Sequence, residues 1–509
     1  MIQLLSIGLT KLNLKEEYYW SPGSIKLSGK INRGAMIIDK DPENLPSNTF
    51  CALPWMHIST RPNGHMRVCC TANASAVQDK DSTNKTVSEA GVLRRDDGKP
   101  ANLATTSLLD AWNNEYMKSV RRMMLKGEKP DSCLKCFKEE DAGHRSKRQW
   151  ETAKWVHELG LEDIIGETQE DGSIPPRVRY IDLRLGSKCQ LACVMCSPHD
   201  SSSWVKEYKQ IYPELKNSRL RDSQEWEKDS GKLAWSGGSY AWHKSNPTFW
   251  DEFWTQVPTL RQLYWAGGEA LIMKEHYMVL EKIIEMGYAK NIEVRYNSNG
   301  LEWDNHLFDL WKEFRNVIFH FSIDSYEDKN HFIRYPSNWE QVVTQLETLD
   351  NYPHGNLRLT TATTILALNI FYLPDFIKWK LDRDWKLLNK FPAGAGMIDL
   401  HLAYWPPQLN CKVLPKWFKQ EVTEKFEDFY PWLEENWKKC NGVEDLSFEK
   451  WRELPYGIKR LEGLVSFMNS EDWSERLPET AEWCNTISKR RKLDFLKIFP
   501  DLEWLEWYL

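Results

Sequence analysis

The chain has 509 residues, of which 41% are hydrophobic and 28% are charged, a composition typical of soluble globular proteins with about two to four domains. Its formal net charge of −6 argues against a nucleic-acid-binding protein that relies on overall positive charge. Neither a membrane span of about 18 apolar residues nor a basic export leader is found in the sequence, so we expect a cytoplasmic protein without a membrane or nucleic-acid partner. In that compartment the 11 cysteines are expected to be thiols or metal ligands.

The N-terminal part of the chain predicts little regular structure before its first helix. Residues 1–45 form an irregular lead-in, and residues 46–150 form a first domain that carries five cysteines. Residues 72–106 are polar and rich in Asn, Asp, Ser and Thr, which predicts a long loop. Apolar residues at helical spacing then predict one helix over residues 108–124, with Ser107 as its N-cap.

Strands and helices alternate in the second half of the chain, after a bridge over residues 151–175 that includes a helix up to Leu159. Helical patterns such as residues 274–286 separate most of the strands over residues 176–408, which predicts an α/β fold with a parallel sheet and outer helices. Residues 409–509 read as a helical C-terminal extension rich in aromatic residues. The expected strands are 178–185, 260–265, 292–296, 317–323, 357–365 and 398–404.

Three cysteines follow the first of these strands in one loop, with the sequence Cys189-Gln-Leu-Ala-Cys193-Val-Met-Cys196. Three thiolates can hold three irons of a 4Fe–4S cluster and leave the fourth iron open to a substrate, as open coordination marks catalysis in zinc enzymes. A structural zinc site would instead show two close pairs of ligands. The loop therefore predicts a catalytic iron–sulfur cluster.

This loop resembles that of the radical S-adenosylmethionine (SAM) superfamily, and further motifs over residues 176–408 strengthen the resemblance. The family fold is a partial (β/α)6 TIM-like barrel. The resemblance implies that a 4Fe–4S cluster binds SAM and cleaves it to a 5′-deoxyadenosyl radical, which abstracts a hydrogen from the substrate. The segments that end the following strands are Ala266-Gly267-Gly268-Glu269, Asn297-Ser298-Asn299-Gly300 and Ser322-Ile323-Asp324-Ser325, with Phe332-Ile333-Arg334 further on.

The resemblance also implies which residues meet SAM. Gly267, Gly268 and Glu269 would contact its amino group, because glycines allow a close approach and a carboxylate accepts hydrogen bonds from an ammonium. Arg334 would pair with its carboxylate. The remaining SAM-facing residues are Asn297, Ser298, Ser322 and Asp324.

The cysteines of residues 46–150 resemble a SPASM or twitch domain, which binds auxiliary iron–sulfur clusters and normally follows the barrel, whereas here it precedes it. One auxiliary 4Fe–4S cluster is implied, and the alternative is a structural zinc site with the same four thiolates. The cluster would relay electrons or support substrate binding. The implied ligands are Cys51, Cys69 (or Cys70), Cys133 and Cys136.

Several other residues carry weaker expectations. Cys411 follows the last expected strand and is either an inert buried thiol or a hydrogen donor to a substrate radical. We expect ordinary roles for the remaining cysteines and for three histidines near the cysteine motifs, although one of these and its neighbour Asp200 follow the cluster loop and are candidates to line the cavity. The histidines are His65, His144 and His199. The 26 tryptophans are expected to pack the core, or else to line a cleft for a peptide or ring-bearing substrate.

The resemblance does not fix the substrate. A ribosomally made peptide or protein, modified by crosslinking, epimerisation or oxidation, is the leading expectation, with flavodoxin or ferredoxin as the electron donor. A small molecule such as a sugar, nucleotide or cofactor precursor is the first alternative. An iron–sulfur or zinc protein that binds partners without turnover is the alternative from another class.

Overall fold

The computed structural model describes residues 42–72, 91–141, 143, 145–222, 226–227, 232–233, 240–388, 397–440, 447–454 and 457–509. Within these ranges, no helix is both long and apolar enough to cross a bilayer. The expected lead-in up to residue 41, most of the expected loop at 72–106, and His144 lie outside the described residues.

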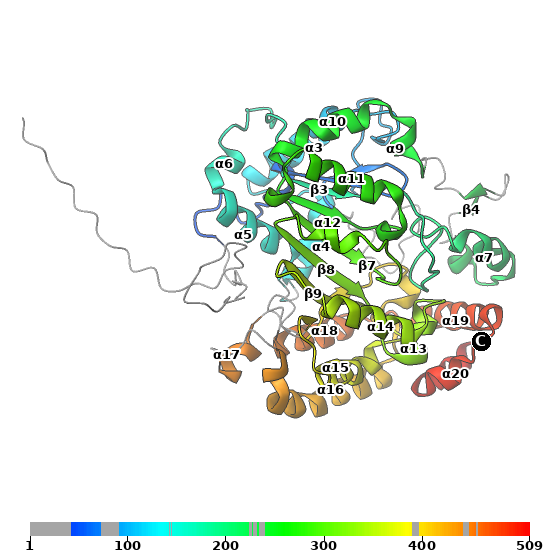
Figure 1. The fold of residues 1–509 in the computed structure, drawn as a ribbon. Helices are drawn as coiled ribbons and strands as arrows, with labels where there is room; N and C mark the ends of the chain where they lie inside the picture. The colour runs from blue at the N-terminus through cyan, green and yellow to red at the C-terminus, as the bar shows by residue number, and fades with distance from the viewer. Residues whose placement is uncertain are drawn as a thin grey trace, which may run out of the picture.

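An eight-stranded sheet forms the centre of the molecule (Figure 1). Its strand order is β10-β9-β8-β7-β6-β3-β1-β2, and every neighbouring pair is parallel except β1 with β2. The six strands predicted from the sequence are all present, which confirms an α/β fold with a mostly parallel sheet. The strands are β1 (His57–Thr60), β2 (Met66–Arg67), β3 (Tyr180–Leu183), β6 (Gln262–Trp265), β7 (Glu293–Ser298), β8 (Asn316–Ser322), β9 (Leu357–Ile365) and β10 (Asp399–Leu402).

The pairing of β1 with β3 was not expected from the sequence. It joins the cysteine-bearing N-terminal segment to the same sheet that carries the cluster loop, with His57 opposite Tyr180 and Ser59 opposite Asp182. A separate antiparallel pair, β4 (Trp226–Glu227) with β5 (Lys232–Leu233), lies in the insert after α7.

The predicted helix over residues 108–124 is wrong in one respect, because the structure has two helices there. Ser107 caps the first, as expected, by accepting bonds from the backbone of Leu109 and Asp110. The helix then stops, and the Asn114 side chain caps the second. Asparagine favours such caps because its side chain bonds to nearby backbone donors. In this region the helices are α2 (Leu108–Trp112), α3 (Glu115–Leu125), α4 (Leu134–Asp141), α5 (Lys147–Leu159) and α6 (Leu161–Ile165).

The remaining helices surround the sheet, and those of the C-terminal extension pack against its outer helices, α16 on α15 and α20 on α13 (Figure 1). Phe332 of α13 meets Phe495 of α20 with ring centres 5.5 Å apart, which fixes the end of the chain beside the core. These helices are α7 (Trp204–Ile211), α8 (Ser218–Asp222), α9 (Trp242–Ser245), α10 (Thr248–Gln256), α11 (Lys274–Glu285), α12 (Leu307–Trp311), α13 (Glu327–Ile333), α14 (Trp339–Asp350), α15 (Leu373–Leu381), α16 (Lys416–Asn436), α17 (Phe448–Arg452), α18 (Ile458–Asn469), α19 (Leu477–Arg491), α20 (Phe495–Ile498) and the 3₁₀ segment η16 (Pro500–Tyr508).

The two faces of the sheet differ in chemistry because neighbouring side chains on a strand point to opposite faces. One face carries apolar residues such as Leu263, Val294 and Phe319, each fully buried. The other carries polar residues in matching register, with Tyr264 opposite both Asp182 and Arg295. We call this second side the polar face; it lies toward the cavity described below.

Candidate functional site

The cluster loop leaves the carboxyl end of β3 and is fastened to the end of α13. The Ala192 N–H donates to the carbonyl of Tyr335 at 2.6 Å, and the Val194 N–H donates to that of Ile333 at 2.8 Å. Between these bonds the sulfurs of Cys193 and Cys196 lie within hydrogen-bonding contact, and Cys189 is close enough to interact with them electrostatically. The three predicted cysteines are therefore brought together on one loop.

Arg491 of α19 braces this loop, a role that the sequence did not reveal. Its guanidinium donates to the Ala192 carbonyl at 2.7 Å and pairs with Glu207 at 2.9 Å. It also lies over the rings of Trp204 and Tyr335, 4.8 and 4.5 Å from their centroids. The C-terminal extension thus holds the cluster loop directly.

The Gly267-Gly268-Glu269 turn follows β6 and packs against the same loop. Gly268 has φ +57°, and a Cβ there would stand 2.6 Å from the carbonyl oxygen of Lys188, so the turn requires glycine. The buried Glu269 carboxylate accepts bonds from Ser298 Oγ at 2.8 Å, the Asn299 N–H at 2.8 Å and the Leu271 N–H at 3.2 Å.

These contacts set what Glu269 can still bind. Burial raises the pKa of its carboxyl, and the three donated bonds oppose that rise. A carboxylate offers about four acceptor sites, so about one remains for a ligand ammonium. Ser298, predicted to face SAM, instead donates its hydroxyl to Glu269 and so positions that carboxylate. The side chain of Asn299 contacts the cluster loop, with its Nδ2 3.3 Å from Gln190 Oε1.

Asp324 and Arg334 form a buried ion pair at 2.7 Å at the carboxyl end of β8. Asp324 also accepts the Thr364 N–H at 2.7 Å. Arg334 also adjoins the cluster loop, because the carbonyl of the preceding residue, Ile333, accepts the Val194 N–H. Arg334 therefore lies where a carboxylate next to the cluster loop can be paired.

The two other SAM-facing residues of the sequence prediction lie on neighbouring strands. Asn297 is the next-to-last residue of β7, and its side chain accepts a hydrogen bond from the hydroxyl of Tyr264 at 3.0 Å. Ser322 ends β8, two residues before Asp324. Both strands present their carboxyl ends toward the cluster loop, as parallel α/β sheets do at active sites.

Four cysteines of the N-terminal region line a small cavity, whose empty space, open solvent included, is about 370 Å³. They are Cys51, Cys69, Cys133 and Cys136. Burial raises the pKa of Cys51 well above its ordinary value and that of Cys136 to about 12, and the neighbouring sulfurs add to both shifts. Such a set favours a metal centre, because iron neutralises thiolates that otherwise repel one another.

The three cysteines of the cluster loop and the four N-terminal cysteines both supply thiolates, which are the usual ligands of iron–sulfur clusters. Among the described residues, no three Cys, His, Asp or Glu side chains meet closely enough to hold a single metal ion. An iron–sulfur cluster makes a different demand, because each thiolate binds its own iron.

Cys70 faces away from the other four cysteines. It lines the cavity on the polar face, not the one that holds Cys69. We expect a Cys69→Ala variant to lose the auxiliary cluster and a Cys70→Ala variant to keep it, and iron content after anaerobic reconstitution measures the difference. Equal iron in the two variants would contradict this ligand assignment.

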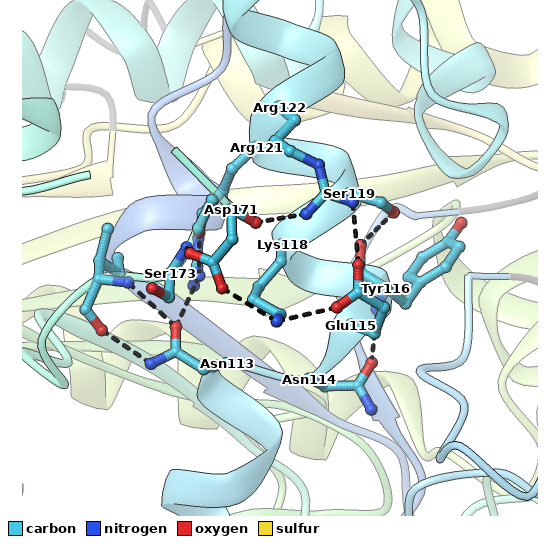
Figure 2. A network of polar contacts seen from close by, with 12 residues as sticks. Asn113, Asn114, Glu115, Tyr116, Lys118, Ser119, Arg121, Arg122, Asp171 and Ser173 are labelled. Atoms are coloured by element: carbon cyan, nitrogen blue, oxygen red, sulfur yellow. Dashed lines mark hydrogen bonds and ion pairs between the residues drawn. The ribbon is translucent and has the colours of Figure 1, made fainter. Parts of the chain in front are cut away.

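A network around α3 ties the auxiliary region to the bridge that precedes β3 (Figure 2). The buried guanidinium of Arg121 donates to the carbonyls of Pro54, Trp112 and Gly172, and to Asn113 Oδ1. On the surface, Lys118 pairs with Asp171 at 3.1 Å. Arg121 thus has a structural role: its hydrogen bonds hold the segment that follows Cys51 against α2 and the bridge.

The histidines near the cysteine motifs make ordinary contacts. His199 is buried and accepts the Arg61 Nε–H at 3.2 Å, and His65 lies 3.3 Å from Asn63 Nδ2. Cys411 is buried, burial raises its pKa to about 12, and it lines none of the cavities described here. Two tryptophans that follow the cluster loop, Trp204 of α7 and Trp242 of α9, are fully buried.

A larger cavity lies against the polar face of the sheet, and its empty space, open solvent included, is about 1480 Å³. Residues of β3, β6, β7, β8 and β10 form one side, and α5 and α18 supply residues from across it. Arg184 links it to the cluster side, because a Cβ added to Gly267 would stand 2.9 Å from the Arg184 side chain. On its other side Lys147 lines both this cavity and the one that contains the auxiliary cysteines.

Two family models match the chain. Residues 183–378 match the radical SAM superfamily, and residues 51–137 match the SPASM iron–sulfur cluster-binding domain, which confirms its position before the radical SAM domain. The radical SAM domain marks the chain as a SAM-dependent iron–sulfur enzyme, whose cofactors are a 4Fe–4S cluster and SAM. The SPASM domain binds auxiliary iron–sulfur clusters.

Comparison with individual proteins adds less. No curated protein matches the sequence. Among solved structures, that of TYW1 with a lysine–pyruvate adduct bound is 16% identical, over 40% of this chain and 57% of that chain, with a TM-score of 0.20.

Proposed function

We propose that this enzyme cleaves SAM reductively and uses the resulting radical to abstract a hydrogen from a peptide or protein. The observation that carries the proposal is the convergence of the Cys189, Cys193 and Cys196 loop with Glu269 and Arg334 at one end of the sheet. We further propose that the parallel strands form the partial barrel typical of this chemistry.

The cluster would supply the chemistry, and Glu269 and Arg334 would position SAM beside it. Cys189, Cys193 and Cys196 would hold the cluster, which when bound would supply the electron for reductive cleavage of the S–C5′ bond of SAM. Glu269 would hold the ammonium of SAM at its remaining acceptor site, and Arg334 would hold the carboxylate. Both side chains are fixed by buried bonds to neighbouring strands, so the site is ordered before SAM arrives.

The leading substrate is a ribosomally made peptide or protein, which would be crosslinked, epimerised or oxidised. Its support is the SPASM domain beside the radical SAM domain. A small-molecule substrate is the second candidate, favoured by the polar lining of the larger cavity. A flavodoxin or ferredoxin would reduce the clusters in the cytoplasm, and the auxiliary cluster would relay electrons or support the substrate.

The test is release of 5′-deoxyadenosine. Anaerobically reconstituted enzyme is reduced with dithionite in the presence of SAM, and the nucleoside is quantified by chromatography. The proposal requires at least slow release, whereas a protein that only binds partners would leave SAM intact.

Cys411 allows a separate prediction about the end of the reaction. Because it is buried away from the described cavities, we expect Cys411→Ser to form product at the wild-type rate. The measurement is product yield per 5′-deoxyadenosine once a substrate is known. Loss of product with continued 5′-deoxyadenosine release would restore Cys411 as the hydrogen donor.

A further inference from the structure

The larger cavity is positively charged in a protein of net charge −6. Six of its lining side chains are cationic and three are acidic, an excess of three positive charges when the two lining histidines are not counted. The cations are Lys135, Arg145, Lys147, Arg184, Arg295 and Arg460, and the acids are Glu139, Glu151 and Asp399. Such a lining attracts anions, and a low-dielectric wall strengthens the attraction.

Carboxylates next to the cavity offset part of this charge, and Arg184 pairs with the buried Asp182 at 3.3 Å. Glu293 is shared by two cations, Lys154 at 2.9 Å and Arg295 at 2.8 Å. Burial alone would raise the pKa of Glu293, but these two cations lower it to about 2. Glu151 behaves in the same way. Burial acts to raise its pKa, but Lys147 and Arg295 lower it to about 2. The carboxylates thus respond to a positive local potential.

Three of the cations gather around two tyrosines. Lys147 of α5 lies 5.8 Å from the ring centroid of Tyr180, and Arg184 lines the same cavity as Tyr264. Arg295 stands in register with Tyr264 on the next strand. Guanidinium and ammonium donors with phenolic hydroxyls form a site suited to the oxygens of a phosphate or a carboxylate.

The cavity also lies in the right place for a substrate. Asn297 lines it and is followed by Ser298, which holds Glu269 of the candidate SAM site. Lys147 lines both this cavity and the one that contains the auxiliary cysteines. A molecule bound here would lie between the two centres.

We infer that the substrate carries an oxyanion, a phosphate or a carboxylate, which is held by Lys147, Arg184 and Arg295. This inference rests on the proposed function and names the chemical class of its substrate. A carboxylate would come from an acidic side chain or the terminus of a peptide, and a phosphate from a small molecule.

The experiment measures anion binding to the reconstituted enzyme without reductant, by isothermal titration calorimetry at constant ionic strength. The probes are inorganic phosphate and succinate, with uncharged glucose as the negative probe. We expect saturable binding of at least one anion, weakened about tenfold or more in Lys147→Gln and in Arg295→Gln, because charge-assisted hydrogen bonds are lost. Binding of phosphate alone identifies a phosphoryl group, and binding of succinate alone identifies a carboxylate.

Two controls keep the result interpretable. Lys312→Gln removes one positive charge from an exposed site that does not line the cavity. This variant should bind the anions as tightly as the wild type does. Lys147 is partly exposed at the start of α5, so its variant tests the site even if Arg295→Gln fails to fold. Wild-type enzyme that binds neither anion, or variants that bind as tightly as wild type, would overturn the inference. Since no SAM cleavage is needed, failure of the proposed chemistry would show separately, as absence of 5′-deoxyadenosine.

Discussion

Replacing Cys193 with alanine is expected to lower 5′-deoxyadenosine release by at least about a thousandfold, because the cofactor carries the chemistry. Cys193 is the most buried of the three loop cysteines, its sulfur meets that of Cys196, and its carbonyl accepts the indole N–H of Trp204 at 2.8 Å. An alanine keeps the backbone bond and removes the thiolate. The variant should therefore keep its fold while it loses the SAM-binding cluster.

Iron content and secondary structure separate these two effects. The variant should retain only the auxiliary cluster, about four irons instead of about eight if both centres are 4Fe–4S. Cys484→Ala is the matched control, since Cys484 is equally buried but lies in α19, far from either group of cysteines in sequence. A Cys193→Ala enzyme with full iron and normal nucleoside release would refute the assignment of the loop.

Much of the fold was predictable because β-branched and aromatic residues mark its strands between helical segments. The strand over Leu357–Ile365 was predicted with its observed bounds. The strand β1 was missed because its four residues, His57–Thr60, are mostly polar, and their burial comes only from pairing with β3. Four residues of this type do not form a pattern that marks a strand.

The site divides in the same way. Cysteine spacing and strand-end motifs identified the cluster loop, Glu269 and Arg334, since these are local in sequence. The choice between Cys69 and Cys70 was left open, because adjacent side chains point to opposite sides and only the packed structure shows which cavity each one faces. The cationic lining was missed for a similar reason, since Lys147, Arg184 and Arg295 come from three separate elements.

Arg491→Ala is expected to reduce the free energy of unfolding by about 2 to 4 kcal/mol and to loosen the cluster loop. The change leaves Glu207 without its partner, frees the Ala192 carbonyl and removes the guanidinium that packs against Trp204 and Tyr335. Glu207 is partly exposed and can regain water, which keeps the loss below that of a fully buried pair. Arg491→Lys should recover only part of the loss, because an ammonium lacks the planar fork and stacks less well.

The neighbouring Arg490 supplies the control for this last effect. Arg490 lies in the same helix as Arg491, but it pairs with Glu214 at the surface. Arg490→Ala should therefore lower the free energy of unfolding by no more than about 1 kcal/mol. Urea unfolding gives the stabilities, and iron bound to the cluster loop, measured in a Cys69→Ala background without the auxiliary cluster, gives the local effect. If Arg491 holds the loop, its alanine variant loses both stability and loop iron, whereas Arg490→Ala loses at most about 1 kcal/mol of stability and no loop iron. Equal behaviour of the two variants would mean that the C-terminal extension does not support the cluster.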